Sequence, residues 1–201
     1  NRLAAIAMSL AVIGVILNSL TKSSITISSL FWILIGAGLG GLLGVITAKR
    51  VPMTSMPETV ALFNGCGGMS SLLVAIGVAT FKDGINERNL IELVSIVLSI
   101  LVGTITFTGS IVAMAKLQGW LSTPQWTQSK KRHFVNIFLA VLVLICSVNF
   151  VISGQSLLTL LVISSALVGI GVTLPIGGAD MPVVISMLNS YSGVAAAAAG
   201  F

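Results

Sequence analysis

The stretch PIGGADMPVVISMLNSYSGVAAAAAGF, residues 175–201, decides how the rest of the chain is interpreted. It begins as a glycine turn, and Asp180 then precedes a helix that is predicted to start at Met181. A weaker copy of this helix, MPETVALFNGCGG, begins at Met56. Four residue types recur at a constant offset of 125 residues, as Met56/Met181, Pro57/Pro182, Asn64/Asn189 and Gly68/Gly193. The repeat predicts two equivalent helices with an asparagine at the same depth in each.

The composition places the chain in a membrane. Only 7% of its residues are charged, 56% are hydrophobic, and the mean hydropathy is +1.10. Soluble domains carry about 25% charged residues, so this chain cannot surround a conventional core with a charged shell, and its surface must face the lipid bilayer. The net charge of +5 does not indicate nucleic-acid binding, because the basic residues occupy short gaps between apolar runs.

Seven apolar segments qualify, or nearly qualify, as membrane-spanning helices of about 20 residues. They are residues 3–20, 27–48, 56–81, 90–117, 135–152, 157–174 and a last segment that begins at Met181. The sequence therefore predicts an all-α integral membrane protein, a bundle of about seven transmembrane helices. We expect residues 1–201 to form one transmembrane domain that is a piece of a longer protein.

The basic residues predict the orientation of this bundle. Seven lie at the start of the chain and after the second, fourth and sixth segments, namely Arg2, Lys49, Arg50, Lys116, Lys130, Lys131 and Arg132. Three lie on the opposite side, namely Lys22, Lys82 and Arg88. The positive-inside rule then places the start of the chain in the cytoplasm, or in the matrix of a mitochondrion. The helices that begin at Met56 and Met181 both start at the inner face and run parallel.

Both of these helices have a typical start. Asp180 is a good N-cap, and the repeat puts Ser55, another good N-cap, at the matching place. Pro57 and Pro182 fall in the first turn, where a missing N–H costs little. Glu58 completes a capping box with Ser55. For Glu58 and Asp180, capping and a role in coupling or catalysis are about equally supported.

Small and polar residues line three of the predicted helices at helical spacing. Asn64 and Asn189 lie about 13 Å inside a hydrocarbon core of about 30 Å, where an amide needs partners. Asn64 shares a face with Gly68 and Ser71, and Asn189 shares one with Ser186 and Gly193. The fourth segment carries Ser99, Gly103, Thr106 and Ser110 in a similar stripe. Any one such residue is best explained as interhelical packing, whereas three stripes together favour a hydrated pathway for water or protons.

This chain offers no enzyme site of its own. It has no dinucleotide or phosphate-binding motif and no Ser/His/Asp arrangement, so no catalytic or cofactor-binding residue is predicted. Cys66 and Cys146 lie in apolar segments without ligand spacing, which predicts packing and no metal site. His133 lies among basic residues and is predicted to face solvent or headgroups. Because asparagine does not titrate near neutral pH, Asn64 and Asn189 can orient a proton but cannot hold it.

Three stretches resemble one known family. GGADMPVVISMLNSYSGVAAAAAGF, MTSMPETVALFNGCGG and ITFTGSIVAMAKLQG are similar, in the same order, to segments of the beta subunit of proton-translocating NAD(P) transhydrogenase. The resemblance implies an enzyme that transfers hydride from NADH to NADP⁺, coupled to inward proton movement. This chain would be its proton-channel domain, in a bacterial inner membrane or a mitochondrial inner membrane.

The resemblance also implies partners and cofactors. An alpha-type subunit would contribute further membrane helices and the domain that binds NAD(H). A soluble NADP(H)-binding domain would follow downstream in the same chain, and the whole assembly would form a dimer. Neither nucleotide would bind to the stretch 1–201 itself.

Residue by residue, the resemblance assigns a proton pathway. Asn189 and Ser110 match intramembrane residues of the family's pathway, Asp180 matches the acidic residue at the inner mouth, and Glu58 matches the glutamate that opens the other helix. Many family members have a histidine where this chain has Asn64, so we expect a partner chain to supply a histidine nearby. The predicted pathway residues are Asn64, Ser110, Asn189, Asp180, Glu58, Ser186 and Ser190.

Two other interpretations remain open on the residues alone. A secondary transporter or channel with a parallel internal repeat would also place two similar helices side by side. A purely structural helix bundle that anchors other subunits is the third interpretation.

Overall fold

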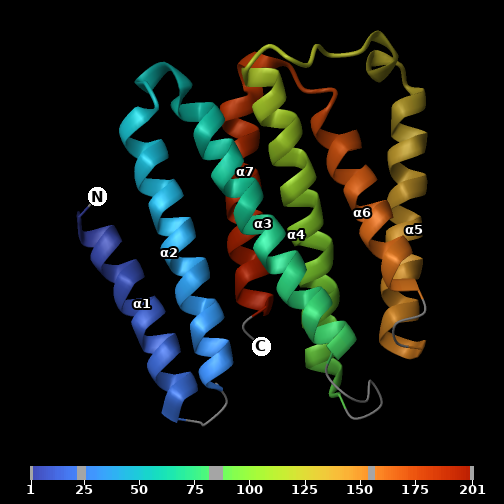
Figure 1. Ribbon diagram of the computed structural model, residues 1–201. Coiled ribbons are helices and arrows are strands. Elements are labelled where there is room, and N and C mark those ends of the chain that lie inside the picture. Colours follow the sequence, from blue (N-terminus) through green and yellow to red (C-terminus); the bar gives the residue numbers. More distant parts are fainter. Residues whose placement is uncertain (1, 22–25, 82–87, 154–156, 200–201) are drawn as a thin grey trace. The chain divides into compact units, whose positions relative to one another are not determined.

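The computed structural model describes residues 2–21, 26–81, 88–153 and 157–199. Within these ranges the regular secondary structure is helical, without a strand. The α-helices are α1 (Arg2–Thr21), α2 (Ile27–Arg50), α3 (Met56–Phe81), α4 (Leu90–Leu117), α5 (Lys131–Ser153), α6 (Leu158–Thr173) and α7 (Met181–Ala199) (Figure 1). Three short 3₁₀ turns, η1 (Met53–Ser55), η3 (Gln125–Gln128) and η5 (Gly178–Asp180), lie in the connections.

The seven predicted segments are thus confirmed as helices. Five of the described helices, α2, α3, α4, α5 and α7, are long and apolar enough to cross a bilayer, whereas α6 has 16 residues. The predicted start of the fifth segment at Val135 was wrong, because α5 begins at Lys131. Apolar runs mark the hydrocarbon core, and a helix can continue for a turn beyond it with charged side chains in the headgroup region. His133 therefore lies on α5 and is exposed, as predicted.

Two compact units make up the chain, residues 1–51 with α1 and α2, and residues 52–201 with the other helices. The second unit contains every predicted pathway residue. Its helices α3 and α7 run in the same direction, with their starts at the upper end in Figure 1, which confirms the parallel pair. We use "upper end" below for this end of the second unit.

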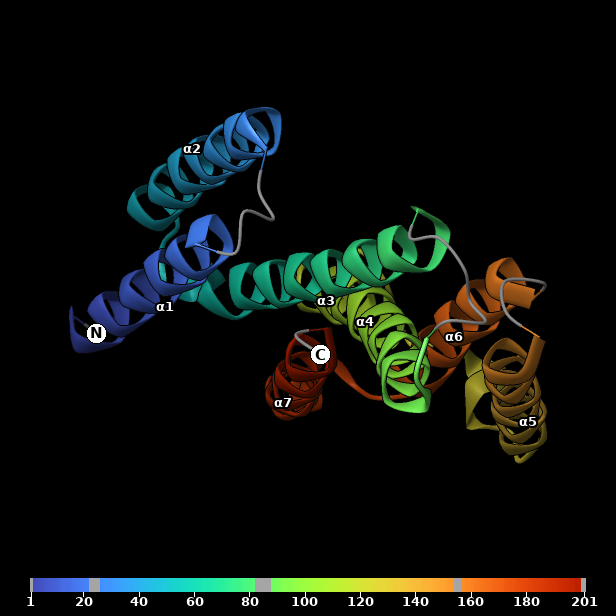
Figure 2. The same cartoon turned by 90° about the horizontal axis from the view of Figure 1, so that it is seen from below.

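Helix α4 is the centre of the second unit, because α3, α5, α6 and α7 all pack against it (Figure 2). One apolar cluster joins α3, α4, α5 and α6 around Ile100 and Phe150, which are both fully buried. A smaller cluster joins α3, α4 and α7 nearer the upper end, and it consists of Ala61, Ala113, Met181 and Ile185. Along α3 and α4, the polar residues of the site lie between these two clusters.

Glycines set the distance between α3 and α4. A Cβ atom on Gly103 would lie 2.8 Å from the carbonyl oxygen of Gly68, and one on Gly68 would lie 2.7 Å from that of Gly103. The two backbones therefore touch at a point where no side chain fits. A Cβ on Gly65, nearly one turn before Gly68, would lie 3.2 Å from the Cβ of Ser110. The glycine pattern thus brings Ser110 against α3.

The internal repeat extends into the structure before each helix. Turns η1 and η5 lie 125 residues apart, and the residues before them, Pro52 and Gly177, have nearly the same extended conformation, with φ of −69° and −66° and ψ of 155°. The predicted N-caps at Ser55 and Asp180 were wrong, since each residue ends a 3₁₀ turn that continues directly into the helix. No hydrogen bond of either side chain occurs within the described part of the chain, and Glu58 forms no capping box there. A continuous turn has no free helix start for a side chain to cap.

Two of the basic residues that were counted as loop charges are buried in the bundle. The ammonium group of Lys116 donates to Thr123 Oγ1 (2.8 Å), to the carbonyl of Ile176 (2.6 Å) and to the carbonyl of Leu174, the C-cap of α6. These bonds use all three of its donors and place a cation at a helix C-terminus. They tie the end of α4 to the connection between α6 and α7. At the opposite end of α4, Arg88 donates to the carbonyl of Val78 on α3 (2.7 Å).

The glycine contact predicts a large effect of a single methyl group. Gly103→Ala should destabilise the second unit by about 1–3 kcal/mol, because a Cβ at this position meets backbone atoms that cannot rotate away. Unfolding of the full-length protein in mild detergent would measure the change. Gly77→Ala, on α3, is the control, since nothing lies within 4 Å of its Cβ position, and it should be neutral or slightly stabilising. Equal effects of the two changes would contradict the close contact.

Lys116 gives a second stability prediction. Lys116→Met should lower stability by about 1.5–3 kcal/mol, the value of a hydrogen bond to a charged group, because the carbonyls of Leu174 and Ile176 lose their shared donor. The same unfolding measurement applies, with Lys49→Met as the control, because Lys49 is exposed in the last turn of α2. A Lys116→Met protein as stable as the control would show that the ammonium group does not hold this connection.

Candidate functional site

Asn64 is the centre of the site. Its side chain is 7% exposed, and its amide group joins two other helices. Asn64 Nδ2 donates to Ser110 Oγ on α4 at 2.9 Å, and Ser192 Oγ on α7 donates to Asn64 Oδ1 at 2.9 Å. The result is a directed chain of hydrogen bonds from α7 through α3 to α4. The amide therefore directs the hydroxyl of Ser192, which donates to Oδ1, and it occupies an acceptor site on Ser110 Oγ.

A groove of about 330 Å³ opens beside this chain of hydrogen bonds. It lies between α3 and α7 and is lined by Val60, Phe63, Asn64, Gly67, Asn189 and Ser192. Two repeat pairs, Asn64/Asn189 and Gly67/Ser192, therefore meet on opposite walls of the same groove. The parallel packing of α3 and α7 explains this arrangement, since equivalent positions of parallel helices lie at the same height.

The structure brings together three of the seven predicted pathway residues. Asn64 and Ser110 are buried and hydrogen-bonded to each other, and Asn189 lies on the groove wall, where it is exposed. At this depth each amide was expected to need partners, in the bundle interior or in a water-filled cavity; Asn64 has them in the interior, whereas Asn189 faces the groove. Repeated sequences do not guarantee equal surroundings, because α3 packs along α4 at Asn64 whereas the Asn189 side of α7 faces outward.

The other four predicted residues lie apart from Asn64. Ser186 and Ser190 are exposed on α7, and Ser190 Oγ donates to the carbonyl of Ser186 at 3.2 Å within that helix. Glu58 is half-buried in the first turn of α3, and Asp180 is exposed in the turn before α7. Within the described residues, neither carboxylate bonds to the Asn64 group. Both carboxylates lie at the upper end. Glu58 precedes Asn64 by between one and two helical turns, and Asp180 precedes Asn189 by more than two.

The stripe predicted on α4 is buried but closely packed. Ser99, Thr106 and Ser110 are each fully buried, and Ser99 Oγ donates to the carbonyl of Ser95 at 2.8 Å and contacts that of Ala195 on α7 at 3.4 Å. Between Ser99 and Ser110, the Gly68–Gly103 contact closes the seam between α3 and α4. The open side of the site is therefore the α3–α7 groove.

Ser192 is the functional candidate that the sequence interpretation left out. It is not among the seven predicted pathway residues, yet it donates the bond that connects α7 to Asn64. A signal was available, because Ser192 lies three residues after Asn189 and occupies the repeat position of Gly67. A small residue at both positions leaves room for the asparagine amide between the helices.

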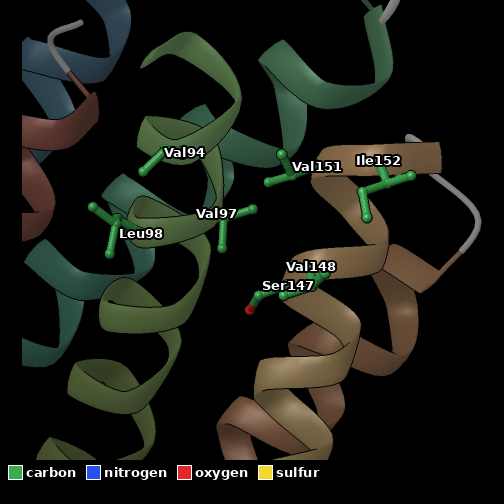
Figure 3. A pocket seen from close by; sticks show the side chains of 7 residues that line it. All are labelled: Val94, Val97, Leu98, Ser147, Val148, Val151 and Ile152. Atoms are coloured by element: carbon green, nitrogen blue, oxygen red, sulfur yellow. The ribbon is translucent and has the colours of Figure 1, made fainter. Parts of the chain in front are cut away.

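A second groove, on α4 and α5, does not offer a polar site. It has a volume of about 240 Å³ and lies between α4 and α5 (Figure 3). The lining consists of Val94, Val97, Leu98, Ser147, Val148, Val151 and Ile152. Its single polar side chain, Ser147, donates to the carbonyl of Val143 at 2.7 Å within α5. Such a surface suits acyl chains and carries no group that could act on a proton.

Comparison with known proteins agrees with the sequence resemblance. The sequence profile described as NAD(P) transhydrogenase beta subunit matches residues 1–201. Two relatives named NAD(P) transhydrogenase subunit beta, both from Rhodospirillum rubrum, are each 38% identical over 208 aligned residues. The alignment covers 100% of this chain and 43% of the relative, so the chain spans less than half the length of the curated relatives it matches. Because that profile matches its whole length, the chain belongs to the NAD(P) transhydrogenase beta subunit family.

Proposed function

We propose that this chain is the proton-conducting membrane domain of an NAD(P) transhydrogenase, which couples inward proton movement to hydride transfer from NADH to NADP⁺. The observation that carries the proposal is the hydrogen-bonded chain Ser192–Asn64–Ser110 beside a groove whose opposite wall holds Asn189. A buried amide linked to hydroxyl groups on two helices is a means of orienting water and protons in the bilayer. Family membership favours this function over a secondary transporter or a purely structural bundle.

Asn64 and Asn189 orient water or a proton by hydrogen bonding, whereas a titratable group is needed to bind the proton. Neither amide changes its charge near neutral pH, so the carrier comes from elsewhere. We propose that a histidine on a membrane helix of the alpha-type subunit lies against the groove. Support comes from α7, whose polar side chains Ser186, Asn189 and Ser190 are exposed at the depth of the hydrocarbon core. The amide of Asn189 needs partners at that depth, and another helix or a water-filled cavity can supply them.

The rest of the proposed complex follows from this role. NAD(H) binds to a soluble domain of the alpha-type subunit, NADP(H) binds to a domain that follows in the same chain, and the assembly is a dimer. Proton access alternates between the two faces of the membrane with the nucleotide state.

Asp180 and Glu58, at the start of α7 and α3, form the inner mouth of the pathway. This mouth lies on the cytoplasmic side of a bacterial inner membrane or on the matrix side of a mitochondrial one. The connection held by Lys116 fixes the turn that carries Asp180.

The test replaces the orienting groups in the complete complex, reconstituted into vesicles. Asn189→Leu and Ser110→Ala should each lower proton-coupled hydride transfer by about tenfold, which corresponds to about 1.4 kcal/mol in the barrier. Proton uptake by a pH-sensitive dye and hydride transfer by absorbance are followed together.

The control for Ser110→Ala is Thr104→Val. Thr104 is also buried on α4, but its hydroxyl donates to the carbonyl of Ile100 in the same helix. Its replacement should leave coupling unchanged. The proposal fails if Asn189→Leu and Ser110→Ala proteins both couple as well as the wild type. It also fails if Thr104→Val is as harmful as Ser110→Ala.

A further inference from the structure

A cavity of about 170 Å³ lies at the upper end of the bundle, away from the Asn64 site. It is enclosed by the beginning of α5, the end of α6 and the 3₁₀ turn η3. Its lining residues are Thr127, Arg132, Val135, Asn136, Leu139, Leu167, Ile170, Gly171, Leu174 and Pro175. Nothing in the proposed proton pathway uses this cavity.

The interior of the cavity is suited to an apolar occupant. Aliphatic side chains of α5 and α6 form most of its wall. The polar groups in the wall already have partners inside the protein: Asn136 Nδ2 donates to the carbonyl of Gly171 at 3.2 Å, and Thr127 Oγ1 donates to that of Pro124 at 2.6 Å. Because these polar groups already have hydrogen-bond partners, a hydrocarbon chain fits the space better than a polar solute.

The rim of the cavity has the opposite character. Arg132 is half-buried, and its Nη1 donates to the carbonyl of Thr127 at 2.8 Å, which holds the guanidinium group at the mouth. Lys130 and Lys131, which precede it, are exposed. No ion pair of these three side chains with a carboxylate occurs within the described part of the chain. The rim therefore carries the positive charge of Arg132, which has no carboxylate partner among the described residues, and the guanidinium donors that remain are suited to phosphate oxygens.

The depth of the rim matches a lipid headgroup. Helix α5 could span a membrane and begins at Lys131, but its apolar run begins near Val135, so Arg132 lies in the turn before that run, where headgroups are expected. The cavity extends from Arg132 along α5 to Leu139, about two turns of helix. A ligand that satisfies both parts has an anionic group at the boundary and an acyl chain below it.

We propose that this cavity binds an anionic phospholipid, with the phosphate at Arg132 and an acyl chain against Val135, Leu139 and Ile170. Basic pockets between transmembrane helices are suited to such headgroups. Inorganic phosphate would match the rim alone, and a neutral lipid or detergent would match the cavity alone. The cavity wall includes Leu174, whose carbonyl accepts from Lys116. The bound lipid therefore supports the connection that leads into α7.

The experiment measures lipid binding by the full-length protein in its complex. The protein is extracted from vesicles of phosphatidylcholine with or without phosphatidylglycerol, and the phosphatidylglycerol that remains bound is counted by native mass spectrometry. Added phosphatidylglycerol should also raise the melting temperature. Arg132→Gln should weaken binding about fivefold, which corresponds to about 1 kcal/mol for one interfacial cation. Leu139→Trp, which fills the cavity, should abolish retention.

The matched control is Arg50→Gln, because Arg50 is an exposed basic residue in the last turn of α2. An equal loss of lipid in Arg50→Gln and Arg132→Gln would show general attraction between charges and would overturn the proposal. Unchanged retention in Leu139→Trp, or equal retention of phosphatidylcholine, would also overturn it. So would a cross-link from a cysteine at residue 139 to a helix of another subunit, which would identify a protein as the occupant. Because no step measures hydride transfer, a failure here is distinct from a failure of the proposed proton pathway.

Discussion

The contact between the backbones of α3 and α4 at Gly68 and Gly103 is the constraint on which the rest of the second unit depends. A methyl group at either position would overlap a carbonyl oxygen at less than 3 Å. Since the hydrophobic effect does not draw helices together inside a bilayer, close packing and interhelical hydrogen bonds must do so. The glycine contact is itself the close packing. Gly68 also lies about one turn from Asn64, so the contact brings the two helices near enough for the 2.9 Å hydrogen bond between Asn64 and Ser110.

That bond creates a polar layer between two apolar clusters. The cluster around Ile100 and Phe150 lies on one side of it, and the cluster around Ala113 and Met181 lies on the other. A hydrogen bond between transmembrane helices contributes only about 0.6 kcal/mol on average, so the layer adds little stability. Its value is geometric, because it holds α3, α4 and α7 in one register, directs the hydroxyl of Ser192 toward Asn64 and gives Ser110 a fixed donor. The proposed proton pathway needs such fixed directions, because the amide itself cannot bind a proton.

Two basic side chains at the upper end of the second unit, Lys116 and Arg132, have different surroundings. Lys116 is buried, and three oxygen acceptors surround its ammonium group, two of them carbonyls at the connection between α6 and α7. Arg132 remains at the boundary with only part of its guanidinium group engaged. The first arrangement satisfies the cation within the protein, whereas the second leaves donors for a ligand. The difference explains why one basic residue is structural and the other marks the proposed lipid site.

The sequence by itself determined the membrane class, the seven helices, the parallel direction of α3 and α7, and the shared depth of Asn64 and Asn189, because apolar length and helical periodicity are local properties. It did not determine which repeat member is buried, since Asn64 faces α4 while Asn189 faces an open groove. Nor did it reveal the partners of Ser192 and Lys116, or the 3₁₀ turns that replace the expected caps at Ser55 and Asp180. These features depend on contacts between residues that lie 46 to 128 positions apart in the sequence. They also depend on the path that the chain takes between helices. Both are decided by the packing of α3, α6 and α7 around α4, which is a property of the tertiary structure.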